Sequence, residues 1–134
     1  MNKLVLGLVS IFFLMTASVK SSVFKKGEWR IDKIKLYKKK AKASYYHDKF
    51  NGRKTASGKR FYNNKLTAAH RKFPFGTRLK VTNENNRKSV IVEITDRGPF
   101  IRNREIDLSK KAFMDIASNE RSGLQDVRIE IIEK

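Results

Sequence analysis

The sequence predicts a mainly β fold, a compact barrel of short strands with one or two short helices. Apolar and polar residues alternate through the neighbouring runs 78–83 and 89–95, which is the two-residue period of a half-buried strand. The same alternation returns over 126–132, after one segment with helical spacing. Several short strands with so little helix favour a β-barrel with helical crossovers.

The order of the strands follows from the turns between them. The first strand candidate, Ala43–Tyr46, is short and is followed by a turn at Asn51-Gly52. Residues 84–87 (Glu-Asn-Asn-Arg) have the composition of a hairpin connection between the runs 78–83 and 89–95. We therefore expect these two strands to be antiparallel neighbours.

One helix is clearly signalled after residue 108. Ser109 is a typical N-cap, and Leu108 before it can pack onto Phe113 in the first turn. The apolar face of this helix consists of Ala112, Phe113, Ile116 and Ala117. Gly123 marks the loop that follows, and the run 126–132 returns the chain to the sheet.

Length, charge and cysteine content limit the classes of function. The 134 residues suffice for one domain with appendages. Lys and Arg number 31 against 13 Asp and Glu, and the resulting charge of +18 predicts an anionic partner such as nucleic acid, anionic lipid or a cell-wall polyanion. The chain has no cysteine, so a packed core must stabilise it without disulfides. Nor is there a Cys for a bacterial lipoprotein anchor, so we expect a soluble or charge-held mature protein.

The N-terminus has the layout of a secretory signal peptide, which we assign to residues 1–22. Lys3 precedes the apolar run Leu4–Met15, and small residues follow it. An uncleaved anchor or a buried first helix is the alternative, although the run is short for a membrane span. Removing residues 1–22 deletes Lys3 and Lys20 and no acid, so the charge falls from +18 to +16. We expect export to the periplasm or the cell exterior, association with the wall, no stable membrane span after signal removal and no nucleic-acid partner.

A basic lead-in at residues 23–42 precedes the predicted domain at 43–134. Nine residues of this segment are Lys or Arg, and Trp29 lies among them. The composition is compatible with a tether to an anionic surface. The alternative is a solvated linker whose few apolar residues pack on the domain.

A carboxylate stands where the strand 89–95 ends. Asp96 opens the segment Asp96-Arg97-Gly98-Pro99-Phe100, whose Gly-Pro pair forces the chain out of the strand. A strand end is a rigid position at which to hold a catalytic acid. The alternative is that Asp96 caps the turn, or pairs with Arg97 or Arg102, and has no chemical role.

Other chemistries have little support in the sequence. The two histidines, His47 and His70, are isolated from one another, so no metal site is predicted. No glycine-rich phosphate loop and no nucleophile elbow occur, so no cofactor is expected. Taken alone, His70 is typical of a structural histidine.

A series of short motifs nevertheless occurs in a specific order. The motifs are Ala-Ser-Tyr-Tyr (43–46), Phe-Asn-Gly-Arg-Lys-Thr-Ala-Ser-Gly (50–58), Leu-Thr-Ala-Ala-His (66–70), Pro-Phe-Gly-Thr (74–77), Val-Thr-Asn (81–83), Asp-Arg-Gly-Pro-Phe (96–100) and the segment 104–109. Their order and spacing closely resemble the rare lipoprotein A (RlpA-like) family. The resemblance covers about residues 43–132.

The resemblance implies a six-stranded double-psi β-barrel and an endolytic peptidoglycan lytic transglycosylase. Such an enzyme cleaves the glycan between N-acetylmuramic acid (MurNAc) and N-acetylglucosamine (GlcNAc) without water and leaves a 1,6-anhydro product. Asp96 matches the family's acid and base, a single carboxyl that serves both proton transfers, and His70 matches a histidine of the same cleft that orients substrate or supports Asp96. Further groove residues expected to bind substrate are Thr55, Ser57, Lys59 and Arg97. We expect a monomer that binds peptidoglycan glycan strands and, by charge, other anionic envelope polymers.

One position departs from the family pattern. Lys59 stands where family members commonly carry a Glu, so a cation replaces a second active-site carboxylate. A cation beside Asp96 would favour its ionised form and weaken it as an acid. Asp107 and Glu105 are acidic residues that could compensate. The alternative function is therefore an expansin-like wall-binding or wall-loosening module that does not cut.

Overall fold

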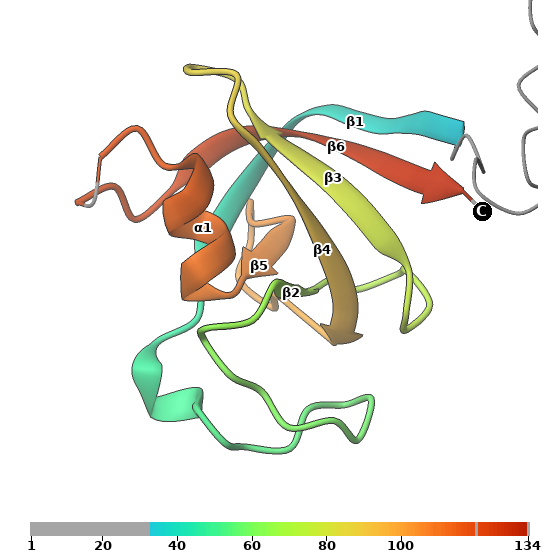
Figure 1. The fold of residues 1–134 in the computed structure, drawn as a ribbon, viewed down its shortest axis with the longest axis vertical. Helices are drawn as coiled ribbons and strands as arrows, with labels where there is room; N and C mark the ends of the chain where they lie inside the picture. The colour runs from blue at the N-terminus through green and yellow to red at the C-terminus, as the bar shows by residue number, and fades with distance from the viewer. Residues whose placement is uncertain (1–32, 120, 134) are drawn as a thin grey trace, which may run out of the picture. The chain divides into compact units, whose positions relative to one another are not determined.

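The computed structural model describes residues 33–119 and 121–133, which form a six-stranded closed barrel with one α-helix (Figure 1). In chain order the elements are β1 (Lys33–Tyr45), the 3-10 helix η1 (Asp48–Phe50), β2 (Thr67–Ala69), β3 (Arg78–Asn83), β4 (Ser89–Asp96), β5 (Ile106–Leu108), α1 (Lys110–Ile116) and β6 (Gln125–Glu133). Around the barrel the strands follow the order β1-β5-β2-β4-β3-β6. The predicted mainly β fold with six strands is confirmed.

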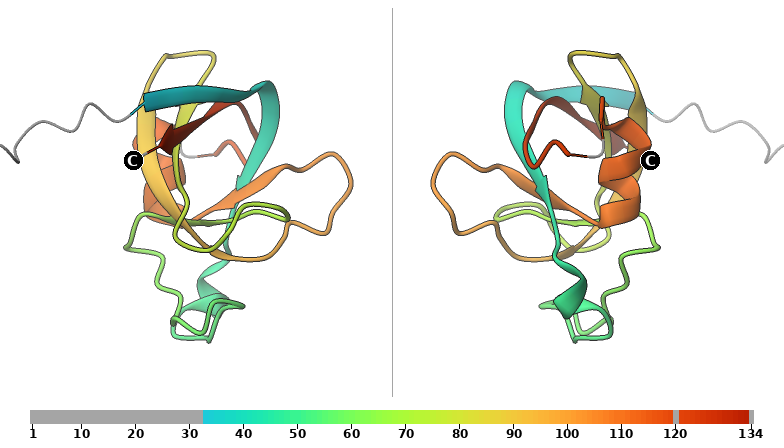
Figure 2. Two further views of the ribbon diagram at one scale, coloured as in Figure 1. Left: turned by 90° about the vertical axis from the view of Figure 1, so that its right-hand side faces the viewer. Right: turned by 90° about the vertical axis from the view of Figure 1, so that its left-hand side faces the viewer.

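Both parallel and antiparallel neighbours build the barrel. The runs predicted as a hairpin, β3 and β4, pair antiparallel with Leu79 opposite Val92, and β6 pairs antiparallel with β3 on its other side. β1 with β5 and β2 with β4 are parallel pairs that join segments far apart in sequence. Two loops extend from this frame: the long connection between β1 and β2, and the loop between β4 and β5 (Figure 2).

One apolar core fills the barrel and the space under the helix. Alternate residues of β3, β4 and β6 point inward, and α1 adds its buried face, as the sequence pattern predicted. The largest fully buried apolar side chains are Phe113, Leu79, Ile94, Ile106, Leu108, Ile116 and Ile129. Burial of each such side chain contributes about 1.5–3 kcal/mol to folding, and this core gives the strand ends a rigid support.

The first strand is much longer than predicted. β1 begins at Lys33, ten residues before the predicted start at Ala43, and pairs with β6 from the Lys33–Glu133 pair to the Ala43–Gln125 pair. Residues 33–42 therefore belong to the barrel wall, and the boundary placed at Ala43 falls inside a strand. Exposed lysines occupy most of this stretch and hide the strand period. The predicted signal peptide, 1–22, and residues 23–32 of the lead-in lie outside the described residues.

The helix is held at both ends. Ser109 is the N-cap of α1, as predicted, and its hydroxyl accepts a hydrogen bond from the Ala112 N–H at 3.3 Å. The buried amide of Asn83, at the end of β3, donates to the Ile116 carbonyl at 2.7 Å and so satisfies the helix C-terminus. No helix within residues 33–119 and 121–133 is long and apolar enough to cross a membrane.

Candidate active site

Asp96 is the last residue of β4 and its carboxylate is held by three donors. One oxygen, Oδ2, accepts a hydrogen bond from the Tyr46 hydroxyl at 2.7 Å. The other, Oδ1, accepts from the backbone N–H groups of Ala56 and Arg97, each at 2.9 Å. The bond from Arg97 is the turn cap that the sequence left open as an alternative, while the bonds from Tyr46 and Ala56 come from the distant loop between β1 and β2. Asp96 is therefore fixed by tertiary structure as well as by its own turn.

The chain leaves β4 sharply after Asp96. Gly98 has a φ of 126°, a backbone conformation that residues with a side chain rarely adopt, and the peptide bond to Pro99 is cis. This turn leads to Phe100, a residue that is 85% exposed, at the edge of the site.

Asp96 opens into a pocket of about 380 Å³, which we call the Asp96 pocket. Its lining combines residues of the loop between β1 and β2 with residues that follow β4. They are Tyr46, Phe50, Arg53, Lys54, Thr55, Phe61, Asp96, Arg97, Gly98, Pro99, Phe100 and Asp107. Aromatic rings, cations and two carboxyls thus surround one cavity, a composition suited to a polar ligand with ring faces.

The second carboxyl of this pocket belongs to Asp107 on β5. Asp96 and Asp107 are both strand partners of Ala69 in the short strand β2, so the topology brings them to the same level of the barrel. Burial raises the pKa of Asp107, and the negative charge of Asp96 raises it further, although the hydrogen bond donated by the Ser44 hydroxyl acts in the opposite direction. Asp107 therefore keeps its proton to a higher pH than an ordinary Asp carboxyl does.

Tyr46, the last residue of the Ala-Ser-Tyr-Tyr motif, is a further member of the site. Its hydroxyl donates to Asp96, and burial together with that hydrogen bond raises the pKa of Tyr46 well above its ordinary value. The phenol therefore stays protonated and acts as a fixed donor. A Tyr after a short strand carries no chemical signal of its own, so only its position beside the other motifs could have pointed to it.

The structure brings together three of the six residues predicted for the site. Asp96, Thr55 and Arg97 line the Asp96 pocket. The Arg97 guanidinium turns away from Asp96, because it donates to the carbonyls of His70 and Phe73 at 3.3 and 2.8 Å and lies 4.0 Å from the centre of the Phe75 ring. Arg97 therefore contributes its backbone N–H to Asp96 while its charge is directed elsewhere.

Ser57 and Lys59 belong to the same loop but do not line the pocket. The Ser57 hydroxyl lies 2.9 Å from the Thr55 hydroxyl, so it supports a residue that does. The Lys59 ammonium pairs with Glu93 at 3.3 Å, on an exposed part of β4. The expected cation beside Asp96 is therefore directed to another carboxylate.

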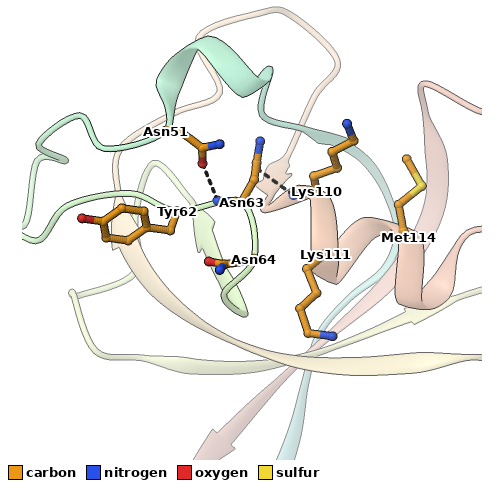
Figure 3. Close-up of a pocket in the computed structure, with 7 residues that line it drawn as sticks. All are labelled: Asn51, Tyr62, Asn63, Asn64, Lys110, Lys111 and Met114. Atoms are coloured by element: carbon orange, nitrogen blue, oxygen red, sulfur yellow. Dashed lines mark hydrogen bonds between the residues drawn. The ribbon is translucent and has the colours of Figure 1, made fainter.

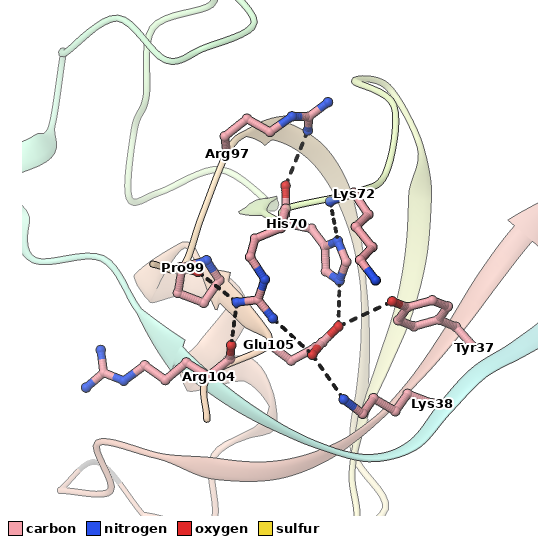
Figure 4. Close-up of polar contacts among 9 residues, drawn as sticks. Tyr37, Lys38, His70, Lys72, Arg97, Pro99, Arg104 and Glu105 are labelled. Carbon is pink, nitrogen blue, oxygen red and sulfur yellow. Dashed lines mark hydrogen bonds and ion pairs between the residues drawn. The ribbon is translucent and has the colours of Figure 1, made fainter. Parts of the chain in front are cut away.

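His70 is fully buried and belongs to a polar network behind the site (Figure 4). Its Nδ1 accepts from the Lys72 N–H at 3.0 Å, so the ring proton resides on Nε2, which lies 2.9 Å from Glu105. Burial lowers the pKa of His70 despite that partner, which favours the neutral ring. The His70 backbone N–H also donates to the Asp96 carbonyl at 3.2 Å. His70 therefore supports the backbone of Asp96 and does not line the Asp96 pocket.

Another pocket, of about 610 Å³, lies between the loop that follows β1 and the start of α1 (Figure 3). Its lining residues are Asn51, Tyr62, Asn63, Asn64, Lys110, Lys111 and Met114. Asn63 holds the loop to the helix, since its Oδ1 accepts from the Lys110 N–H at 2.9 Å. The lining contains no carboxyl group, so acid–base chemistry favours the smaller Asp96 pocket.

Comparison with known proteins identifies the family to which this chain belongs. The family described as "Lytic transglycolase" matches residues 38–129, which include both carboxyls. The chain is 53% identical over 91 residues to "Probable endolytic peptidoglycan transglycosylase RlpA" of Synechocystis sp., covering 68% of this chain and 28% of that protein. It is 50% identical over 91 residues to "Endolytic peptidoglycan transglycosylase RlpA" of Pasteurella multocida, covering 68% of this chain and 31% of the relative. The chain thus spans about a third or less of the length of these relatives.

Solved structures share the fold at low sequence identity. Streptomyces papain inhibitor superposes with a TM-score of 0.56 at 22% identity, covering 72% of this chain and 96% of the inhibitor. An expansin of Clavibacter michiganensis superposes with a TM-score of 0.58 at 18% identity, covering 73% of this chain and 52% of the expansin. Because both identities are low, these similarities concern the barrel alone.

Proposed function

Because the chain belongs to the lytic transglycolase family of RlpA-like double-psi β-barrels, we propose that it is an endolytic peptidoglycan lytic transglycosylase. The reaction cleaves the bond from MurNAc to GlcNAc within glycan strands and closes a 1,6-anhydro ring on the MurNAc product. The observation that carries the proposal is the pair of carboxyls, Asp96 and Asp107, in one pocket. The proposed substrate is a polymer of the cell envelope, in agreement with the signal peptide expected from the sequence.

We assign the two proton transfers of the reaction to these two carboxyls. Asp107 donates its proton to the glycosidic oxygen as the bond between that oxygen and C1 of MurNAc breaks. The 6-hydroxyl oxygen of the same sugar then bonds to C1, and Asp96 accepts the hydroxyl proton. One bond breaks and one forms, and one proton is given and one taken, so no water is consumed.

The environments of the two carboxyls favour this division of labour over a single carboxyl that serves both steps. The raised pKa of Asp107 suits a proton donor. Asp96 has three donors on its oxygens, so its orientation is fixed, and its negative charge is suited to stabilise the positive charge that develops on the sugar ring. After the reaction the proton returns from Asp96 to Asp107 through solvent, which regenerates the starting state.

Other residues of the pocket bind and orient the glycan. Phe100 offers an exposed ring face against which a sugar can pack, and Thr55 offers a hydroxyl. Ser57 and His70 act as positioning residues, the first through the Thr55 hydroxyl and the second through the backbone of Asp96. Lys59 lies at the outer edge of this loop, where it pairs with Glu93.

The decisive experiment compares wild type with Asp96→Asn on purified peptidoglycan and on glycan strands stripped of peptide. Asp115→Asn, an exposed change on α1, is the matched control. Soluble products are identified by mass. Anhydro-muramyl products from wild type and the control, but not from Asp96→Asn, support the proposal. Sedimentation with the wall and no products from any variant would instead assign the expansin-like binding function.

A further inference from the structure

A third pocket, which we call the basic pocket, lies next to the candidate active site and is used by none of the steps above. Its volume is about 380 Å³, and five basic side chains line it: Lys38, Lys40, Lys42, Arg71 and Arg104. Arg71 connects the two pockets, since its guanidinium donates at 2.7 Å to the carbonyl of Pro99, a residue of the Asp96 pocket.

The carboxylates in the basic pocket do not balance its charge. Glu105 and Asp126 also line it, so its five cations face two anions. Glu105 already contacts Lys38 at 3.1 Å and His70 at 2.9 Å, and Asp126 pairs with Lys42 at 2.5 Å. Among the described residues, the side chains of Lys40 and Arg104 form no hydrogen bond or ion pair, and their charges act only at longer range, Lys40 on Asp126 and Arg104 on Asp107. The uncompensated charge favours an anionic ligand.

Arg71 is held in place before any ligand arrives. Its Nη1 donates to the carbonyls of Pro99 and Arg104, at 2.7 and 2.8 Å, and its Nη2 reaches Glu105 at 3.4 Å. These bonds use three of the five N–H groups of a guanidinium. Two donors remain for a ligand, and because the side chain is already ordered, binding loses little conformational entropy.

We propose that the basic pocket binds a phosphate group, such as one carried by an anionic polymer of the envelope. Its basic residues come from three separate segments of the chain: β1, the loop after β2 and the loop before β5. A tetrahedral phosphate presents oxygens to several directions at once, whereas the two oxygens of a carboxylate lie in one plane. The site shares no lining residue with the Asp96 pocket, although the charges of Arg71 and Arg104 reach Asp107, and it would retain the protein on a phosphate-bearing surface.

NMR titration of the ¹⁵N-labelled chain tests the proposal without peptidoglycan. Sodium phosphate and sodium acetate are titrated at constant ionic strength, and the amides of 103–105 and the Arg71 side chain are followed. Phosphate should give saturable shifts confined to this pocket. Lys40→Gln combined with Arg104→Gln should raise the Kd about tenfold, since each removes a charge-assisted contact. Lys88→Gln, an exposed change on the hairpin between β3 and β4, is the matched control.

Two further arms identify the source of the phosphate and separate this proposal from the proposed cleavage. Soluble polyphosphate and vesicles of phosphatidylglycerol in phosphatidylcholine are compared as ligands, with pure phosphatidylcholine vesicles as the blank. Asp96→Asn should bind phosphate like wild type, so a failure of cleavage leaves this result unaffected. Equal saturation by acetate, non-saturating shifts at lysines throughout the chain, or an equal loss in Lys88→Gln would overturn the phosphate site.

Discussion

Asp96 and Asp107 lie at the same level of the barrel, because both are strand partners of Ala69. β2 separates β4 from β5, so the two backbones stand two strand spacings apart, about 10 Å. The side chains nevertheless line one pocket, and the charge of Asp96 contributes to the raised pKa of Asp107. Removing that charge by Asp96→Asn should lower the pKa of Asp107. Carboxyl ¹³C shifts followed against pH measure it, and an unchanged Asp107 titration would show that the carboxyls are not coupled.

Loss of the proton donor should abolish most of the activity while the fold is kept. Asp107→Asn preserves the shape of the side chain and removes its ionisable proton, so we expect turnover to fall about 10²- to 10⁴-fold, the usual contribution of a general acid. Binding to glycan strands should change little. Rates from product mass analysis and a thermal melt of the same sample provide the check. Turnover within threefold of wild type would exclude Asp107 as the donor.

The pH dependence of cleavage should carry the signature of Asp107. Activity needs this carboxyl protonated, so kcat/KM should fall as pH rises through its pKa. Because burial and Asp96 both raise that pKa, the fall should begin above the ordinary Asp value of about 3.9. A pH profile on soluble glycan strands measures the position of this limb. A profile that rises with pH throughout would contradict the assigned role.

Tyr46 should support catalysis through Asp96 without contacting the reacting atoms. Tyr46→Phe removes the 2.7 Å hydrogen bond to Oδ2 but keeps the ring that packs beside Phe61. We expect about a tenfold loss in kcat, from a less fixed carboxylate, and a stability loss of about 1 kcal/mol. Tyr62→Phe, at an exposed tyrosine outside the Asp96 pocket, is the control for kinetics and for urea unfolding. An equal loss in both variants would remove the special role of Tyr46.

Lys59 should tolerate loss of its charge. Its ammonium pairs with Glu93, and both side chains are substantially exposed, so the pair contributes about 0–1 kcal/mol to stability. Lys59→Gln should leave kcat/KM within about twofold of wild type. Measured rates on soluble strands decide the point: a large gain in activity would mean that the cation does suppress Asp96, as the sequence alone suggested.

The elements that the sequence predicted correctly are those that a pattern of neighbouring residues identifies. The strands 78–83 and 89–95 and the N-cap at Ser109 follow from nearest-neighbour patterns, and all three occur as predicted. Three-residue strands such as β2 and β5 are too short to show a period, and they are defined only by their partners across the barrel. The strand β1 was shortened in prediction because its exposed lysines resemble a solvated linker.

The candidate site likewise contains residues that the local sequence indicates and residues that only distant contacts bring into place. The end of a clear strand drew attention to Asp96, and its match to the RlpA-like motif led to its prediction as the acid. Asp107 acquires its place from the register of β2 between β4 and β5. The direction of a long side chain is also set by distant partners. Glu93 draws Lys59 away from Asp96, and two carbonyls of the 70–73 loop draw Arg97 away, so neither orientation could be read from spacing.

The buried pair His70 and Glu105 should make the fold sensitive to acid. Burial lowers the pKa of His70, so below about pH 6.5 the unfolded chain binds a proton that the folded chain does not. The free energy of unfolding therefore decreases as the pH is lowered. Burial opposes ionisation of Glu105, but hydrogen bonds from Lys38 and His70 prevail and lower its pKa. The stability that Glu105 contributes is therefore fully present at a pH above the pKa of Glu105 in the unfolded chain. It is lost as the pH falls through the lower pKa of the folded chain.

The variant His70→Gln separates the contribution of His70 from that of the other titrating groups to the pH dependence of the unfolding free energy. It removes the titrating ring, so we expect a loss of about 1–3 kcal/mol at pH 7 and a smaller difference from wild type at pH 5. Urea unfolding at pH 7, 6 and 5 measures both values. The same change at the exposed His47 is the control, and it should leave the change in unfolding free energy between pH 7 and 5 as in wild type. If His70→Gln lost as much unfolding free energy between pH 7 and 5 as wild type does, the buried ring would not be the source of the loss. Other groups would then have to bind the proton on unfolding.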